Sequence, residues 1–393
     1  MRSLTRHLRV GALALAGLAA SGLVAACAPV RADNGPGSAA VARSDAAIAV
    51  SPEDASRKWN PTKPILVTVA SGRFSKVVVH GGGDRVSGHY LRGGSVWEST
   101  SRLAYATRYR VHATAVDATG RVATSRTSFR TVHPKSLLGV SVTPLGGWTV
   151  GVGMPIIVTF DRPVQDRAKV ESLLHVTSHP SVQGGWYWVS DQMVRWRPRD
   201  YWPAGTKVSL NAALAGQDLG GGVWGGSDVH LNFTIGSATV DTVDMASDEL
   251  TVRQNGKVIR TIPVTTGKPG WDTRVGTKVI MSRQPEVTMD AATLDVPKNS
   301  PDYYRLKVQW AMRLTWSGEF LHAAPWSVAD QGVDNVSHGC TGMSDANALW
   351  LYDFSKVGDP VVYVNGTRPL EPWNGYTDWN IPWSQWQAGS ALH

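Results

Sequence analysis

Short stretches in which apolar and polar residues alternate, separated by turn-forming residues, fill most of the chain from residue 59 onward. Alternation with a period of two predicts β-strands that bury one face. The clearest strand segments of residues 59–134 are 65–69, 76–80, 109–116 and 127–132. With roughly seven such strands and regular turn signals, this part of the chain is typical of an immunoglobulin-like β-sandwich.

Residues 135–236 repeat this pattern and predict a second immunoglobulin-like sandwich. Two alternating segments, 185–189 and 193–197, flank the turn residues 190–192 and predict a hairpin. A short helix is expected over residues 164–173. Because neither sandwich contains a cysteine or a close pair of acids, we expect both to act as spacers or docking modules.

A third unit is expected over residues 237–366. Asn255-Gly256 between two alternating segments is a strong hairpin signal, and Trp316-Ser317-Gly318 predicts another hairpin. Ser344 is a candidate N-cap for a helix. The apolar residues expected on one face of that helix are Ala346, Leu349, Trp350 and Phe354. The fold class predicted for the whole chain is mainly β: two sandwiches, then a β-rich unit with one short helix.

Residues 367–393 hold several tryptophans without a regular period. The chain has 17 tryptophans in all, and most are expected to pack in the cores of β-domains. We therefore expect this Trp-rich extension to pack onto the third unit.

The N-terminus has the pattern of an export signal. Arg2, Arg6 and Arg9 precede the apolar stretch 10–26, which ends in small residues before Cys27. This is similar to a bacterial lipobox, so residues 1–26 are expected to be a lipoprotein signal peptide and Cys27 the lipidated residue. Ordinary cleavage nearby and an uncleaved anchor are the alternatives, although the apolar stretch is short for a spanning helix.

The expected location is therefore the outer face of the cell membrane, facing the cell wall. Residues 27–58 are rich in Ala, Gly, Ser and Pro and are expected to form a flexible tether. Because the later connections are short, we expect a rod-like monomer.

The formal net charge is +8, and 42% of the residues are hydrophobic, enough for each domain to bury a core. Removal of the three signal arginines leaves 36 basic and 31 acidic residues, an excess of five. A mild excess suits anionic lipid headgroups or wall polymers. No dense Lys/Arg run is present, which argues against a nucleic-acid partner.

Cys340 is the only cysteine besides Cys27, and it lies in the glycine-containing segment 337–343. His338 is two residues before it and His322 eighteen residues before it. A lone cysteine is often a small core residue. A thiol with an imidazole nearby, however, is the minimum needed for nucleophilic acyl transfer. The segment is expected to be a loop that leads toward the N-terminus of the helix at Ser344, whose dipole would stabilise a thiolate or an oxyanion.

These residues resemble the L,D-transpeptidases of the YkuD type. The resemblance starts from the motif Ser337-His338-Gly339-Cys340 with Phe320-Leu321-His322 before it. It extends over further segments of the chain, namely Tyr304, Trp310, 317–320, 324–327 and 378–383. With the lipobox and two sandwiches, the chain resembles the mycobacterial branch of that family along nearly its whole exported length.

The resemblance implies peptidoglycan cross-linking. The family's cysteine attacks the stem peptide after the L-centre of meso-diaminopimelate, D-alanine leaves, and the side-chain amine of a second stem resolves the thioester into a 3→3 link. By this resemblance Cys340 is the nucleophile and His322 its general base, oriented by a backbone carbonyl expected to be that of Ser337. His338 and Gly339 would shape the oxyanion hole with Cys340, although His338 could equally hold the loop.

The family's substrate-contacting positions correspond to Tyr304, Ser317, Gly318, Phe320, Trp326 and Gly342. Because Tyr303 precedes Tyr304, the family's tyrosine could correspond to either residue. Carbapenem-type β-lactams are the covalent inhibitors that the resemblance implies, and no cofactor is implied. Gly342 departs from the family, which commonly has asparagine there, so the rate or the preferred acceptor could differ.

Three other functions remain to be weighed. Water instead of an amine could resolve the thioester, giving an L,D-carboxypeptidase or endopeptidase with the same residues. A non-catalytic wall-binding lipoprotein would fit the sandwiches, but it would not need both His322 and Cys340. A papain-like protease usually has its cysteine before its histidine, the reverse of the order found here. A zinc site is not expected, because Cys340 is the one cysteine available and no spaced ligand set accompanies it.

Overall fold

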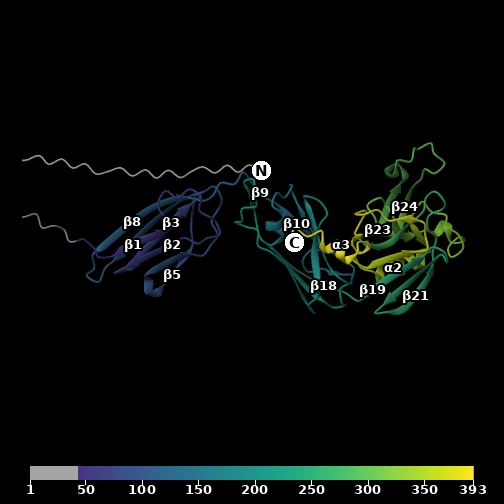
Figure 1. Cartoon of the computed structure of the whole chain (residues 1–393), viewed down its shortest axis with the longest axis horizontal. Coiled ribbons are helices and arrows are strands. Elements are labelled where there is room, and N and C mark those ends of the chain that lie inside the picture. Colours follow the sequence, from purple (N-terminus) through teal and green to yellow (C-terminus); the bar gives the residue numbers. More distant parts are fainter. Residues whose placement is uncertain (1–42, 393) are drawn as a thin grey trace, which may run out of the picture.

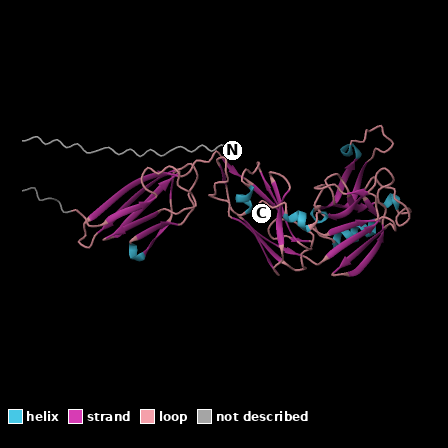
Figure 2. Ribbon diagram, viewed as in Figure 1, coloured by secondary structure: helices cyan, strands magenta, loops and turns pink. Residues whose placement is uncertain are grey.

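Three β-rich bodies follow one another in a row along the long axis of the molecule (Figure 1). The structure is a computed structural model that describes residues 43–392. Strands dominate each body and the helices are short, which confirms the prediction of a mainly β chain (Figure 2). Signal residues 1–26, Cys27 and most of the predicted tether lie outside the described residues. Among the described residues, no helix is both long and apolar enough to cross a membrane.

The first body is a sandwich of two four-stranded sheets. One sheet has the order β1 (Ala47–Ser51), β2 (Leu66–Ala70), β6 (Val96–Ser99), β5 (Gly88–Leu91). The other has the order β4 (Asp84–Arg85), β3 (Arg73–Gly81), β7 (Arg108–Val116), β8 (Val122–Arg130), and the 3₁₀ turn η1 (Arg92–Gly94) lies between β5 and β6. Inward-facing apolar residues of both sheets, such as Val67 and Val111, form a shared core.

Strand β1 corrects the predicted tether, because it lies inside the range 27–58. It pairs antiparallel with β2 over its whole length. Its alternate residues Ile48 and Val50 pack against the core of the first sandwich. Packing of these two side chains outweighs the Ala- and Ser-rich composition that suggested a flexible linker.

The second body is also a two-sheet sandwich. Its first sheet has the order β10 (Val140–Thr143), β12 (Ile156–Phe160), β15 (Met193–Pro198), β14 (Gly184–Trp188). Its second has the order β11 (Thr149–Val150), β18 (Val229–Ile235), β16 (Lys207–Ala212), β13 (Leu174–His179), and β9 (Ser136–Leu138) pairs separately with β17 (Val223–Gly225). The predicted helix is shorter than expected, α1 (Arg167–Glu171), because the carboxylate of Asp166 caps it by accepting from Lys169 N.

The third body contains a six-stranded and a four-stranded sheet. The larger has the order β21 (Lys257–Pro263), β20 (Glu249–Gln254), β19 (Thr239–Asp244), β27 (Pro360–Val364), β22 (Arg274–Val279), β28 (Arg368–Pro369). The smaller has the order β23 (Ser282–Asp290), β24 (Arg305–Arg313), β25 (Phe320–Ala323), β26 (Thr341–Met343). Its helices are α2 (Asp345–Phe354) and α3 (Trp383–Gln387), with 3₁₀ turns η2 (Ala291–Leu294), η3 (Pro325–Ser327) and η4 (Asp378–Asn380). The predicted Asn255-Gly256 hairpin is confirmed, with positive φ at both residues.

Helix α2 begins where the sequence indicates but buries a partly different face. The hydroxyl of Ser344 accepts from Asn347 N at 3.3 Å, which confirms the N-cap. The buried residues are Ala348 and Leu351, whereas Ala346 is exposed. The predicted face is therefore wrong in part. Ala346 and Leu349 are exposed, whereas Trp350 and Phe354 are partly buried against the same core as Ala348 and Leu351, where the helix packs on β24 and β25.

The C-terminal extension packs on the third unit, as expected, and also on the second sandwich. On the third unit the Asn380 amide donates to Thr277 O at 2.7 Å, and Asn374 Oδ1 accepts from Ser317 N at 3.0 Å. Trp386 of α3 is fully buried, and its indole nitrogen donates to Gly185 O at 2.8 Å. The guanidinium of Arg197 lies 4.7–5.3 Å from three tryptophan rings of this extension, those of Trp379, Trp383 and Trp386. The extension therefore ties the third unit to the second sandwich.

Two buried acids lie at the same junction. Asp241 in β19 and Asp359 just before β27 have no exposed surface. Burial raises the pKa of Asp359 to about 7, and burial together with Asp359 raises the pKa of Asp241. A Cβ on Gly151 of the second sandwich would lie 2.2 Å from Asp359 Oδ1, so the two bodies are in close contact there.

We expect Asp359→Asn to stabilise the third unit at neutral and higher pH. A carboxyl whose pKa is raised on folding costs stability as the pH rises from about 4 towards about 7, and the cost is absent below that window. Thermal unfolding should show an apparent Tm higher by roughly 5 °C at pH 8, with the difference vanishing near pH 4. The exposed Asp353→Asn is the control, and an equal Tm shift at every pH would contradict this account.

Candidate active site

Parallel pairing of β25 with β26 brings His322 next to the cysteine segment. In this register His322 lies opposite Gly342, two residues beyond Cys340. Alternation along β25 directs Leu321 and Ala323 into the core beneath α2. The neighbouring positions on β25 and β26, His322 and Gly342, line a pocket together with Cys340.

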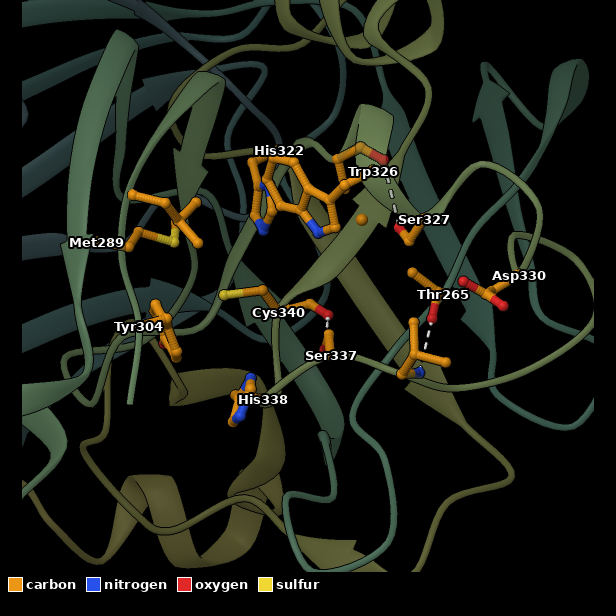
Figure 3. Close-up of a pocket in the computed structure, with 14 residues that line it drawn as sticks. Thr265, Met289, Tyr304, His322, Trp326, Ser327, Asp330, Ser337, His338 and Cys340 are labelled. Atoms are coloured by element: carbon orange, nitrogen blue, oxygen red, sulfur yellow. Dashed lines mark hydrogen bonds between the residues drawn. The ribbon is translucent and has the colours of Figure 1, made fainter. Parts of the chain in front are cut away.

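Side chains from several segments converge on this pocket (Figure 3). Its lining consists of Thr265, Met289, Tyr304, Leu306, His322, Ala324, Trp326, Ser327, Asp330, Val336, Ser337, His338, Cys340 and Gly342. Met289 and Leu306 are cross-strand neighbours on β23 and β24. The pocket therefore lies between that hairpin and the segment joining β25 to β26.

The thiol of Cys340 is buried and protonated in the resting structure. It donates to Gly318 O over 3.5 Å and lies against Phe320. Burial raises the pKa of Cys340 to about 12, while the Phe320 N–H and the cations Lys278 and Arg313 act in the opposite direction. A base must therefore remove the thiol proton during attack.

His322 lines the same pocket, and one of its ring nitrogens can accept a proton. Its Nδ1 lies 2.7 Å from Ala323 O, which makes Nδ1 the protonated nitrogen and leaves Nε2 as the acceptor. Burial lowers the pKa of His322, so the ring is neutral near pH 7. The carbonyl that orients the ring is thus that of Ala323, not the expected one of Ser337. The ring also faces Trp326, with centroids 6.1 Å apart.

Ser337 and Gly339 form a tight turn before Cys340. The Ser337 hydroxyl donates to Cys340 O at 2.7 Å and accepts from Gly339 N at 3.0 Å. Gly339 has φ +117°, a conformation that other residues rarely adopt. Thr273 Oγ1 donates to Gly339 O at 2.9 Å and supports the turn from outside. The amide of Gly339, expected in an oxyanion hole, is therefore engaged within the turn in the resting structure.

The chain leads from Cys340 toward the helix as expected, but part of this connection is a strand and not a loop. Strand β26 separates the cysteine from α2, because Thr341 and Met343 are held in the sheet beside β25. The helix N-terminus is capped by Ser344 at the far end of that strand.

His338 is held between two aromatic rings. Its ring centroid lies 4.9 Å from that of Trp271 and 4.9 Å from that of Tyr304. Its Nε2 is 3.5 Å from Asp302 Oδ1, and Asp302 also pairs with Lys268 at 2.8 Å. Burial and Lys268 lower the pKa of His338, so a neutral ring borders the pocket.

The predicted substrate-contacting residues divide into two groups. Tyr304, Trp326 and Gly342 line the pocket. Ser317, Gly318 and Phe320 lie outside its lining. The carbonyl of Gly318 accepts from the thiol, Phe320 is buried beneath Cys340, and Ser317 is bonded to Asn374. These last three residues support Cys340 and the turn between β24 and β25.

A buried ion network lies beneath the cysteine turn. The carboxylate of Glu319 pairs with Lys278 Nζ at 2.5 Å and with the Arg274 guanidinium at 2.9 Å. Burial lowers the pKa of Lys278 to about 8, with Glu319 opposing that shift. A Cβ on Gly339 would lie 3.9 Å from Glu319 Cγ, so the carboxylate passes close to the turn. The network fixes charges of both signs behind the thiol.

Several pocket residues were missed by sequence reasoning. Thr265 follows β21 and exchanges two backbone hydrogen bonds with Gly342, each of 2.9 Å. Asp330 comes from the segment between β25 and β26. No motif marks Thr265 or Asp330: Thr265 is remote in sequence, and the segment around Asp330 contains no periodic pattern. Ser327 lies in the segment 324–327 that the resemblance included, although no role was assigned to it.

Packing explains why position 342 is a glycine in this chain. A Cβ there would lie 2.8 Å from the Ala324 Cβ and 3.2 Å from Thr265 Cγ2. Both neighbours leave too little room for the asparagine that is common at this position in the resembling family.

The site as a whole is a neutral thiol–imidazole pair in a mostly apolar pocket, suited to acyl transfer. Within residues 43–392, no cluster of three or more His, Cys, Asp or Glu residues could hold a metal ion.

Comparison with protein families matches two parts of the chain. The L,D-transpeptidase catalytic domain, YkuD, matches residues 239–362. A bacterial Ig domain, Big_10, matches residues 56–218, a range that spans most of both sandwiches.

Similar proteins of Mycobacterium tuberculosis align over most of the chain. L,D-transpeptidase 2 is 42% identical over 84% of this chain and 81% of its own length. L,D-transpeptidase 5 is 34% identical over 87% of this chain and 76% of its own length. A solved L,D-transpeptidase in complex with imipenem is 40% identical, with a TM-score of 0.52 over 57% of this chain and 99% of that one.

The pH dependence of thiol alkylation tests the resting state of Cys340. In a chain starting at residue 28, this is the only cysteine. Because the pKa is raised to about 12, the rate with iodoacetamide should rise about tenfold per pH unit up to pH ~10 without a plateau. Free cysteine, measured in parallel, should level off near pH ~9. A plateau of the protein's rate below pH ~9 would show a preformed thiolate instead.

Introducing asparagine at position 342 should lower the stability of this chain. Gly342→Asn places a Cβ against Ala324, and such overpacking costs about 1–3 kcal/mol of stability. Gly342→Ala should cost a similar amount, because the Cβ and not the amide causes the contact. Combining Gly342→Asn with Ala324→Gly should recover much of the lost Tm, as measured by thermal unfolding. An asparagine variant as stable as the wild type would contradict the packing account.

Proposed function

Because the chain belongs to the L,D-transpeptidase family, we propose that it forms 3→3 cross-links in peptidoglycan through a thioester on Cys340. The observation that carries the proposal is the placement of Cys340 and His322 in one pocket by adjacent strands. The donor is a tetrapeptide stem and D-alanine is released.

The first half-reaction acylates the enzyme. His322 Nε2 takes the proton of Cys340 while the sulfur attacks the carbonyl carbon after the L-centre of meso-diaminopimelate. The protonated imidazole then gives this proton to the departing amine, and D-alanine leaves as the thioester forms. A neutral imidazole and a neutral thiol at rest support this sequence, because neither ion must be stored in a buried pocket.

In the second half-reaction the amine of an acceptor stem attacks the thioester. His322 accepts the proton that this amine loses and returns it to the departing sulfur. Asp330 is the one carboxylate in the lining of this pocket, and it supplies a partner for a cationic acceptor group. Tyr304 and Trp326 offer aromatic surface on opposite sides of the thiol (Figure 3).

Carbapenem-type β-lactams are proposed as covalent inhibitors that acylate Cys340. A similar L,D-transpeptidase is described in complex with imipenem. A strained β-lactam carbonyl would meet the same thiol and the same base as the stem peptide does.

The site of action is proposed to be the outer face of the cell membrane. The lipobox-like segment before Cys27 motivates this location, with residues 1–26 as the signal peptide and the lipid on Cys27. The residues between Cys27 and β1, fewer than the predicted tether holds, would connect the lipid to the first sandwich.

Intact-protein mass spectrometry with a disaccharide-tetrapeptide donor tests the proposal. A chain of residues 28–393 keeps β1 and all three bodies. The wild type should gain the mass of the acyl group and accumulate a 3→3 dimer. Cys340→Ala should form no adduct, and His322→Ala should acylate at least 10²-fold more slowly. His338→Gln, a pocket variant outside the proton transfer, is the matched control and should still acylate.

The outcomes separate the candidate activities. An adduct that yields only tripeptide would replace the transpeptidase with an L,D-carboxypeptidase. A wild type that forms no adduct with the stem or with a carbapenem, and whose thiol resists alkylation, would leave a wall-binding scaffold as the remaining function.

A further inference from the structure

Positive charge is concentrated in the first sandwich. Residues 45–133 contain 13 Lys and Arg against 6 Asp and Glu, an excess of seven positive charges. Residues 237–393 contain the same number of Lys and Arg but 17 acids, an excess of four negative charges. The molecule is therefore basic at its N-terminal body and acidic at the catalytic one, a polarity that the net charge of +8 hides.

Strand register gathers the basic side chains on one face of a single sheet. In β7 and β8, Arg108 lies opposite Arg130 and His112 opposite Arg126, while Arg110 lies opposite His80 of β3. Residues opposite each other in an antiparallel pair point to the same side. The basic face, as defined here, comprises the exposed residues Lys76, His80, Arg85, Arg108, Arg110, His112, Arg126 and Arg130. The opposite side of this sheet is apolar and forms the core, so the outer side is left to solvent.

These charges have no acidic partners within residues 43–392. Among the described residues of the first sandwich, Arg102 is the only Lys or Arg within 4.0 Å of a carboxylate, and it lies outside the basic face. In the third body six cations are paired in this way, among them Lys278 with Glu319 and Lys307 with Glu286. Unpaired cations on one exposed face repel one another, a cost that an anionic partner removes.

One end of the basic face is hollowed. A pocket there is lined by Ser56, Arg57, Arg108, Ser128 and Arg130 with two neighbouring residues. Three guanidinium groups and two hydroxyl groups around one depression match the oxygen atoms of a phosphate group. Asp54, whose carboxylate accepts from Ser128 N, is the acid near this end.

The position of this body along the chain favours a membrane over a more distant polymer. The first sandwich begins at β1, and the apolar stretch 10–26 and Cys27 lie N-terminal to it. Of the three bodies it is the nearest in sequence to the proposed lipid at Cys27. Cations spread over the exposed face of a sheet also suit a layer of anionic headgroups.

We propose that the basic face of the first sandwich binds the headgroup layer of anionic phospholipids. This contact would hold the first sandwich at the membrane, while the acidic third body is repelled from the same surface and stays turned towards the wall. The contact does not require the lipid on Cys27. The proposal can also be tested separately from the transpeptidase activity.

Vesicle sedimentation tests the proposal with residues 28–393 carrying no lipid. Large vesicles of phosphatidylglycerol and phosphatidylcholine in equal parts are compared with pure phosphatidylcholine, each at ~0.05 M and ~0.5 M salt. The wild type should bind only the anionic vesicles and only at low salt. Arg110→Ser with Arg126→Ser should weaken the partition coefficient about 30-fold, because each arginine near the surface contributes separately.

Matched variants separate the basic face from total charge. Arg92→Ser with Lys63→Ser removes the same charge from segments beside the opposite sheet, and it should change binding less than 3-fold at low salt. Arg110→Lys with Arg126→Lys keeps the charge and should keep binding. Far-UV circular dichroism and the thermal unfolding curve should be the same for all variants, which shows that the first sandwich of each is folded.

Three results would overturn the proposal. The first is equal binding to both kinds of vesicle, and the second is equal loss in the two charge-removing variants. The third is a wild type that ignores anionic vesicles but sediments with purified wall fragments, which would assign the face to a wall polymer instead.

Discussion

The parallel pairing of β25 with β26 is the constraint on which the active site depends. Two parallel neighbours cannot be joined by a tight turn, so the chain must cross over between them. Residues 324–340 make that crossover and supply one wall of the pocket, including Trp326 and Asp330. The eighteen-residue spacing of His322 and Cys340 is thus the length of a connection that both joins the strands and encloses the substrate.

Burial of the thiol sets the chemistry of the pair. The same environment that raises the pKa of Cys340 lowers that of His322, so both groups rest in their neutral forms. The ion network of Lys278, Glu319 and Arg274 places compensated charge directly behind the cysteine turn. In such a site the thiol proton is transferred to the imidazole while the sulfur attacks the substrate carbonyl, so no free thiolate has to form beforehand.

Arginine side chains and aromatic rings hold the second sandwich against the catalytic body. Arg195 forms a buried ion pair with Asp378 at 3.1 Å, and Arg197 lies among the tryptophans of the C-terminal extension. Such cation–π contacts are strongest where water is excluded. The first sandwich has a different character, with its cations exposed and unpaired on one sheet face. The second and third bodies are therefore linked by buried contacts, whereas the first sandwich presents an exposed, positively charged face.

The sequence by itself determined the β class, the order of the three bodies, the Asn255-Gly256 hairpin and the cap at Ser344, because each rests on a pattern a few residues long. It also singled out Cys340 and His322, since acyl transfer needs those two groups. Only the tertiary structure decided which carbonyl orients His322 and which face of α2 is buried. It also decided that β1 joins the first sandwich, that the tryptophans of the extension pack on the second, and that Gly342 has no room for a side chain. Those choices depend on segments distant in the sequence that meet in space, and no local period records them.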